Sequence, residues 1–281
     1  MTAISVTNHD QRFQNSLNIP GLKHDEAGVS AAVEAQRLLA LIESLADDDW
    51  DRPTDCSEWT VRDMVAHLAG AVASQASWTE FKRQNMGNPY MKEVEMKIDA
   101  INRRQVEDRA GATHEELTAE FRENAPKAVR TRQRLPWPVR QLRLPLGPPL
   151  GFASIGYVMD TIFTRDQWMH RHDIALATGR EMVVSPEHDG RIQALVIRDL
   201  GRKLKGQLHG RTIDLLLTGE AGGNFRFGPG GQADAVIEMD TSTFNRLASG
   251  RLPAEAALAQ ATVEGDQAVA TWFLNQTDIP Y

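Results

Sequence analysis

The chain has 281 residues, of which 41% are hydrophobic and 25% are charged, with 21 Gly and 13 Pro. These proportions are typical of a globular protein of one large or two smaller domains, and they exclude collagen-like and disordered chains. With 31 Lys and Arg against 38 Asp and Glu, the formal net charge is -7, which argues against nucleic acid as a partner.

No stretch is apolar for the roughly 18 residues that a membrane-spanning helix needs. The start, MTAISVTNHDQRFQ, lacks the basic and apolar regions of a signal peptide, so we expect a cytoplasmic protein with no membrane partner. The single cysteine, Cys56, cannot form an intramolecular disulfide or a cysteine-rich zinc site, and we interpret it as a packing residue. Any metal must therefore be held by histidines and carboxylates.

Residues 1–25 show no sustained periodicity and are predicted to form an N-terminal arm. A first helix is predicted over residues 26–45, where apolar residues recur at spacings of three and four. A second helix is predicted to start at Thr60, because Thr60 and Asp63 resemble a capping box and an apolar stripe follows them.

A third helix is predicted to start at Thr113, which has Glu116 three residues later. Pro126 is expected to kink or divide this helix, because proline lacks the backbone N–H that an interior position donates. The prolines between residues 135 and 151 argue against a helix or a central strand, and they predict a long, stiff connection.

A fourth helix is predicted over residues 154–178, with Gly179 just after its C-cap. Four helices within residues 26–183 predict a helical bundle. Residues 184–281 change in character and predict a small α+β domain, so the fold class of the whole chain is α+β. The segments of this second domain are a helix over 188–204, strands within 211–220, 223–228 and 234–240, and short helices over 241–250 and 267–274.

The fourth predicted helix carries ionisable residues on its apolar face. At 100° per residue, Asp166, His170 and Asp173 lie within about 60° of the centre of the stripe formed by its apolar residues. A buried carboxylate needs a cation, hydrogen bonds or a metal. Asp166 and His170 are four residues apart and can reach one ion, although a simple hydrogen bond in the bundle core, without a metal, is the commoner explanation of such a pair.

His67 lies at the edge of the apolar stripe of the second predicted helix and could face the same interior. Taken alone, such a residue is more often an ordinary histidine of the core or its boundary. Together with Asp166 and His170 it completes the three-ligand set of a catalytic zinc site, which has two histidines and one carboxylate from two helices.

The segments TDCSEWTVRDMVAHLAG and TRDQWMHRHDIALATGR, with the α+β tail, resemble the mycothiol-dependent maleylpyruvate isomerase family, which belongs to the DinB-like metal-binding bundles. The resemblance covers roughly residues 30 to 275. It implies a DinB-like four-helix bundle that holds a divalent metal, usually zinc, followed by a domain similar to sterol carrier proteins.

By this resemblance, the metal ligands are His67, Asp166 and His170. The family has glutamate where this chain has Asp166, whose shorter side chain implies a metal closer to the helix or bound less tightly. The run Ser249-Gly250-Arg251 resembles a Gly-Arg pair of the family, which makes Arg251 a candidate for binding a carboxylate substrate. A solvated surface arginine is the alternative for this residue.

The resemblance also implies a low-molecular-weight thiol, mycothiol or a related compound, as the cofactor. An open position on a divalent ion suits this role, because the ion can bind and deprotonate a thiol at neutral pH. The expected reaction is isomerisation of a small electrophile or transfer of the thiol onto it, in a monomer or small homo-oligomer. The competing interpretation is a non-enzymatic carrier of a lipid or another small molecule, with a structural or vestigial metal site.

Overall fold

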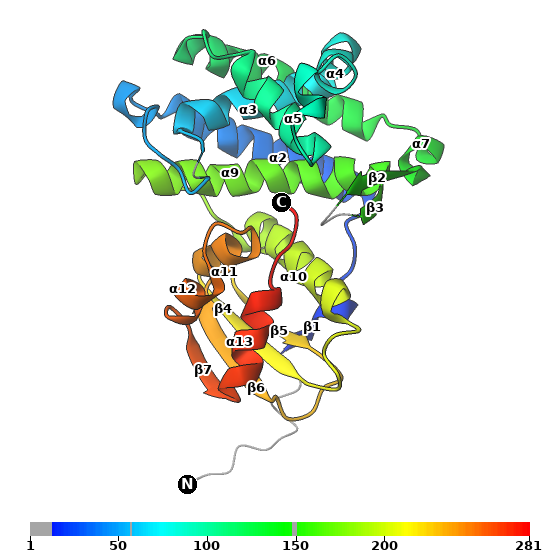
Figure 1. Ribbon diagram of the computed structural model, residues 1–281, viewed down its shortest axis with the longest axis vertical. Helices are drawn as coiled ribbons and strands as arrows, with labels where there is room; N and C mark the ends of the chain where they lie inside the picture. The colour runs from blue at the N-terminus through cyan, green and yellow to red at the C-terminus, as the bar shows by residue number, and fades with distance from the viewer. Residues whose placement is uncertain (1–12, 57, 148–150) are drawn as a thin grey trace. The chain divides into compact units, whose positions relative to one another are not determined.

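The computed structural model describes residues 13–56, 58–147 and 151–281. They form two compact units (Figure 1). The first, the helical unit, is Leu22–Val183 with the last residue of the chain, and the second, the sheet unit, is the chain up to Gly21 together with Val184–Pro280. A helical region followed by a region with a sheet confirms the predicted α+β class.

The helical unit contains the elements expected from periodicity and several others. Its helices are α2 (His24–Glu43), α3 (Val61–Ala76), α4 (Trp78–Asn85), α5 (Lys97–Glu107), α6 (His114–Gln133), α7 (Trp137–Gln141), α8 (Ile155–Tyr157) and α9 (Phe163–Thr178), with 3-10 turns at Asp47–Asp49 and Pro89–Lys92 and a π turn at Val158–Ile162. The helices α4 and α5 were not predicted; they are short, and their sequences are mostly polar. Polar contacts hold them instead, such as the bond from Gln84 Nε2 to the carbonyl of Gly70 (2.9 Å).

Both predicted helix starts are confirmed by their capping bonds. The carboxylate of Asp63 accepts from the backbone N–H of Thr60 (3.0 Å), while the Thr60 hydroxyl accepts from the backbone N–H of Asp63 (3.3 Å). Thr113 and Glu116 make the same reciprocal pair at the start of α6. Capping depends on residues three apart in sequence, which is why these starts could be predicted.

Of the two effects expected of Pro126, a kink or a division of the third helix, the division is wrong, because α6 continues through Pro126 to Gln133. Its buried residues include Phe121 before the proline and Ala128 and Val129 after it, so the apolar face of α6 packs along both halves. Tertiary packing of an apolar face supplies most of the stability of such a helix, and here it offsets the lost hydrogen bond.

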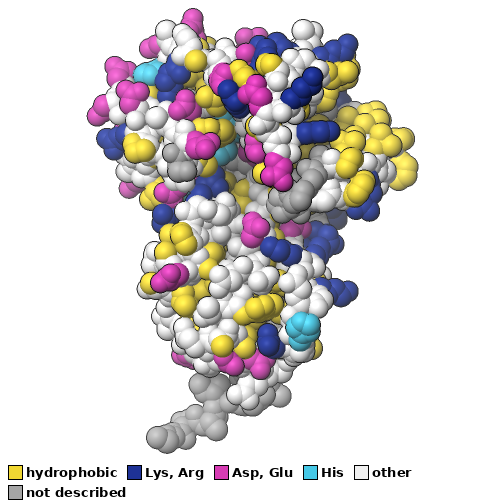
Figure 2. Space-filling model, in the orientation of Figure 1, with side chains coloured by type: hydrophobic (Ala, Val, Ile, Leu, Met, Phe, Trp, Pro, Cys, Tyr) yellow, Lys and Arg dark blue, Asp and Glu magenta, His cyan; other side chains and the backbone are white. Residues whose placement is uncertain are grey.

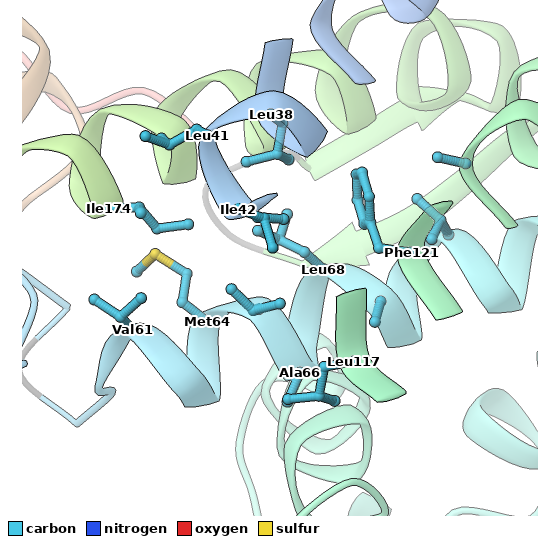
Figure 3. Packing of buried hydrophobic residues seen from close by; sticks show 14 of the residues in the cluster. Leu38, Leu41, Ile42, Val61, Met64, Ala66, Leu68, Leu117, Phe121 and Ile174 are labelled. Carbon is cyan, nitrogen blue, oxygen red and sulfur yellow. The ribbon is translucent and has the colours of Figure 1, made fainter. Parts of the chain in front are cut away.

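The core of the helical unit lies between α2, α3, α6 and α9. Figure 3 shows side chains from these helices packed together, including Ile42 of α2, Met64 and Leu68 of α3, Phe121 of α6 and Ile174 of α9. All five are 0 or 1% exposed. This packing holds α3 and α9, which carry the candidate ligands, in one body.

The proline-rich segment is more ordered than the predicted connection. It contains the short helix α7 and the antiparallel strands β2 (Arg143–Gly147) and β3 (Gly151–Ser154), and residues 148–150 lie outside the described part. Proline is tolerated here because both strands of a two-stranded hairpin are edge strands, in which a residue need not donate a backbone hydrogen bond. The register also shifts between Pro145 and Gly147. Figure 2 shows hydrophobic side chains gathered over this region, where Trp137 and Phe152 are exposed.

The sheet unit has one five-stranded sheet in the order β1-β5-β4-β6-β7, with β4 antiparallel to β5 and parallel to β6. Its strands are β1 (Gln14–Asn15), β4 (Ile213–Thr218), β5 (Gly223–Phe227), β6 (Ala235–Asp240) and β7 (Thr262–Gly265). Its helices are α10 (Arg191–Leu204), α11 (Thr241–Ala248), α12 (Ala254–Leu258) and α13 (Gln267–Gln276), with a 3-10 turn at Ser16–Asn18 and a π turn at Pro186–Gly190. In Figure 1, α13 crosses the face of the sheet turned toward the viewer.

Part of the predicted N-terminal arm belongs to this sheet. Gln14 and Asn15 pair in parallel with Phe225 and Arg226 of β5, while residues 1–12 lie outside the described part. The next residue, Ser16, is 1% exposed and packs against α10. A two-residue strand has no measurable periodicity, so the sequence could not indicate it.

Among the described residues, no helix is both long and apolar enough to cross a membrane.

Candidate metal centre

The three predicted ligands come together in the interior of the helical unit. His67 lies in the middle of α3, and Asp166 and His170 lie one turn apart on α9. The Nε2 atoms of both histidines are 3.5 Å from Oδ1 of Asp166, and the two imidazole rings meet edge to face with centroids 5.1 Å apart. One carboxylate oxygen therefore lies beside two imidazole nitrogens.

These distances suit a small tetrahedral ion. Ligand atoms bonded to zinc at about 2.0 to 2.1 Å in a tetrahedral arrangement are about 3.4 Å from each other. The two spacings of 3.5 Å from Asp166 Oδ1 are close to that value, and the ligand atoms of all three residues lie within 4.8 Å of one another. Only small side-chain movements are needed for the three to share one ion.

The environment of His67 supports the same fit. Its side chain is buried, and within residues 13–56, 58–147 and 151–281 neither ring nitrogen has a hydrogen-bond partner. A buried polar atom without a partner costs free energy, and a metal bond from one nitrogen removes part of that cost. An ordinary core histidine is expected to have at least one hydrogen bond.

The charges of the centre are coupled. Burial disfavours ionised Asp166, but the adjacent His67 and His170 outweigh that effect and hold the pKa of Asp166 below its usual value of 3.8. Burial also disfavours protonated His170, and hydrogen bonds to Asp166 and Asp173 more than offset it, so the pKa of His170 is raised well above 6.5. In the absence of a metal, an imidazolium and a carboxylate therefore share the site.

Asp173 makes a further contact with the centre. The sequence placed this residue on the apolar face of the fourth predicted helix but gave it no function. Its Oδ2 lies 3.0 Å from Nδ1 of His170, so Nε2 is the nitrogen that faces Asp166 and His67. A carboxylate behind a metal-binding imidazole commonly fixes its tautomer and orientation. The signal for this role was the position of Asp173 at the centre of the apolar stripe.

Cys56 and Trp59 lie close to the same histidines. Cys56 packs against the hydrophobic core as predicted, and its Sγ is also 3.9 Å from Oδ2 of Asp173. Cys56, His170 and Asp173 form a second group whose ligand atoms are within 4.8 Å of one another. The ring centroid of Trp59 lies 4.9 Å from that of His67 and 5.9 Å from that of His170. Sequence reasoning gave Trp59 no role here, because its loop has no periodicity.

Arg171, next to His170, has a structural role. Its Nε donates to Oε1 of Glu34 (2.6 Å) and its Nη2 to Oε2 (3.1 Å), and both side chains are fully buried. This ion pair joins α9 to α2. It holds in place the helix that carries Asp166 and His170.

Arg251 belongs to the sheet unit, just after α11. It is half-buried, and its backbone N–H donates to the carbonyl of Arg246 (2.8 Å). Its role in binding a carboxylate substrate stays a prediction.

Residues 31–175, which contain all three predicted ligands, match the family model described as the mycothiol maleylpyruvate isomerase N-terminal domain. The chain belongs to this family. The match covers all of α3 and α6, about two thirds of α2 and most of α9, the four helices that form the core of the helical unit.

Two curated relatives are uncharacterized proteins of Mycobacterium tuberculosis, one from each of two strains. Each is 26% identical to this chain over 150 residues, which is 53% of this chain and 65% of the relative. The matched stretch thus covers less than two thirds of the length of these relatives.

The fold is similar to the crystal structure of the mycothiol-dependent maleylpyruvate isomerase and to that of a histidine-to-alanine mutant of the same enzyme. Each comparison has a TM-score of 0.56 and 13% sequence identity, and it covers 90% of this chain and 96% of the solved one. At this identity the likeness concerns the fold, which extends over both units of the chain.

Proposed function

We propose that this protein is a metal-dependent enzyme that uses mycothiol or a related low-molecular-weight thiol to isomerise a small electrophile or to transfer the thiol onto it. The observation that carries the proposal is the convergence of His67, Asp166 and His170, from two helices, on one point of the interior. Membership of the mycothiol maleylpyruvate isomerase family supports the choice of thiol.

The three side chains would hold a divalent ion, with zinc the best match to two imidazoles and one carboxylate. When bound, such an ion supplies Lewis acidity that lowers the pKa of a thiol, so that a thiolate is available at neutral pH. Asp166 is the most open of the three, with 21% of its side chain exposed against 4% for His67 and 9% for His170. A thiol would therefore approach from the side of Asp166.

The residues around the ligands would keep the site ready for that chemistry. Asp173 accepts a hydrogen bond from Nδ1 of His170, which leaves Nε2 directed at the centre. The ring of Trp59 lies against both imidazole rings and would limit the access of water on that side. A dry site strengthens each electrostatic contact within it.

The two reaction types differ in what happens to the new carbon–sulfur bond. In an isomerisation, sulfur adds to a carbon of the double bond, the resulting single bond rotates, and elimination breaks the carbon–sulfur bond and restores the double bond. In a transfer, the carbon–sulfur bond stays and a proton or a leaving group balances the reaction. Mass spectrometry of a thiol–electrophile mixture with the enzyme separates the two, because only a transferase leaves a stable adduct.

Metal analysis of protein purified without chelator tests the proposal directly. We expect about one divalent ion per chain in the wild type, and its loss in His67→Ala and His170→Ala. His209→Asn is the matched control, because His209 is exposed, lies in the sheet unit and has a φ of 50° that asparagine also tolerates. A wild-type protein with no divalent ion, or the same content in all variants, contradicts the proposal.

A further inference from the structure

Arg132, near the end of α6, is a buried cation with an incompletely bonded guanidinium. It is 3% exposed, and its Nη1 donates to the carbonyl of Met159 (3.2 Å) and to Oγ1 of Thr164 (3.3 Å). Its Nε and Nη2 are also buried and have no hydrogen-bond partner in the part of the chain that the structure describes. One edge of the guanidinium is therefore bonded and the other is not.

The unbonded edge has the shape of a carboxylate receptor. The N–H groups of Nε and Nη2 point in parallel and can bind both oxygens of one carboxylate. Other buried arginines of this protein use that same pair of atoms to hold a carboxylate with two bonds. These pairs are Arg171 with Glu34, Arg109 with Glu120, and Arg226 with Asp214.

The carboxylates near Arg132 are already bonded to other groups. Asp160 and Asp166 are the acids whose charges act on it. Asp160 accepts from both Nη atoms of Arg140, and Asp166 lies between His67 and His170. Burial lowers the pKa of Arg132 to about 10, so the side chain is still charged at neutral pH. Among the described residues, no carboxylate is thus bonded to the guanidinium of Arg132.

We propose that the Nε–Nη2 edge of Arg132 binds a carboxylate of the small-molecule substrate, beside the candidate metal centre. Arg132 donates to Thr164, which lies two residues before Asp166 on α9, and the charge of Asp166 acts on it, so the guanidinium lies near the ligand set. In the proposed function, the substrate would then be an electrophile that carries a carboxylate. Only the conversion of this substrate rests on the proposed function. Carboxylate binding by Arg132 itself needs no metal.

The test measures succinate binding to the metal-free and zinc-loaded full-length chain by isothermal titration calorimetry. We expect Arg132→Gln to bind succinate about 10- to 100-fold more weakly than the wild type, because a charge-assisted two-bond contact is lost. Arg132→Lys should also be weakened, since lysine keeps the charge but not the paired N–H groups. Arg130→Gln is the control, because Arg130 is exposed on the same helix.

Two further measurements separate this role from a structural one. The melting temperature of metal-free Arg132→Gln should equal or exceed that of the wild type, because the substitution removes a buried charge. In turnover with a thiol, Arg132→Gln should raise the KM of a carboxylate-bearing electrophile and leave the KM of an uncharged one, such as N-ethylmaleimide, unchanged.

Succinate affinity that is equal in the wild type and Arg132→Gln overturns the proposal, as does a wild type that binds no succinate in either form. A strong loss of melting temperature in Arg132→Gln also overturns it, since the residue is then structural. Failure of the metal proposal has a different signature: the wild type takes up no divalent ion, while succinate binding to the metal-free chain still depends on Arg132. Sulfate is titrated in parallel, and a preference for sulfate over succinate rejects a carboxylate as the ligand.

Discussion

Nδ1 of His170 lies 3.0 Å from Oδ2 of Asp173, less than one turn further along α9, while Nε2 of the same ring faces Asp166. The two nitrogens of this imidazole therefore have different partners. An acceptor behind Nδ1 keeps the proton there and leaves the lone pair of Nε2 for the centre.

Asp173→Asn should therefore weaken metal binding without removing a ligand. We expect about a 10- to 100-fold lower zinc affinity, the usual effect of losing a carboxylate behind a ligating histidine. A competition titration against a chromophoric chelator measures it, with Asp47→Asn as a control at an exposed acid. Equal affinities of Asp173→Asn and the wild type contradict this role of Asp173.

Two replacements of Asp166 separate the effect of its charge on zinc affinity from the effect of its side-chain length. Asp166→Asn keeps the size of the side chain and removes its charge, so we expect a loss of zinc affinity of at least about tenfold. Asp166→Glu keeps the charge on a side chain that is longer by one methylene, and it should retain the ion, because the partly exposed side of the site offers room. The same competition titration reports both variants. Better retention by Asn than by Glu would show that Asp166 is not a ligand.

Metal uptake should release protons near neutral pH. The pKa of metal-free His170 is raised well above 6.5, so at pH 7 the metal must displace a proton from this ring. The apparent zinc affinity is expected to rise as the pH increases toward that raised pKa. Calorimetry in buffers of different ionisation enthalpy counts the released protons, and a count of zero at pH 7 contradicts the protonated state of His170.

The same pair makes the stability of the metal-free protein depend on pH. The pKa of Asp166 is lowered, so its contribution is present above about 3.8 and is lost as the pH falls. The pKa of His170 is raised, so its contribution is present below about 6.5 and is lost as the pH rises through the folded-state pKa. Chemical denaturation should show the largest difference between wild type and Asp166→Asn between these two values. A difference that grows steadily above pH 7 would contradict this coupling.

The buried pair of Glu34 and Arg171 predicts a large effect on stability. Glu34→Ala leaves a buried guanidinium without its carboxylate, and we expect a loss of about 3 to 5 kcal/mol in the free energy of unfolding. Glu123→Gln is the control, because its pair with Lys127 has exposed fractions of 71% and 43%, and an exposed ion pair adds little to stability. Similar values for both variants in urea denaturation would refute a structural role for the buried pair.

Features that depend on near neighbours in sequence were predictable. The capping boxes at Thr60 and Thr113 need residues three apart, and Asp166 and His170 share a helix face because they are four apart. The continuity of α6 through Pro126 was not predictable, because it depends on the packing of both halves against other helices. The same is true of β1, a two-residue strand whose partner strand lies far along the chain.

Arg132 shows why part of the site could not be found from sequence. The end of α6 reads RTRQ and is followed by another arginine, and periodicity does not distinguish these cations from one another. Only packing makes Arg130 and Arg134 exposed and Arg132 buried. Its incompletely bonded edge is a property of the folded interior and has no local signature.

Local spacing determined the four long helices of the helical unit, the starts at Thr60 and Thr113, the change to an α+β region, and the pairing of Asp166 with His170 on one face, because each of these depends on residues close in sequence. Tertiary structure decided that His67 meets that pair and that Arg132 is buried with one edge unbonded. These contacts join helices that are distant in sequence, and their geometry follows from the packing of the core between α2, α3, α6 and α9.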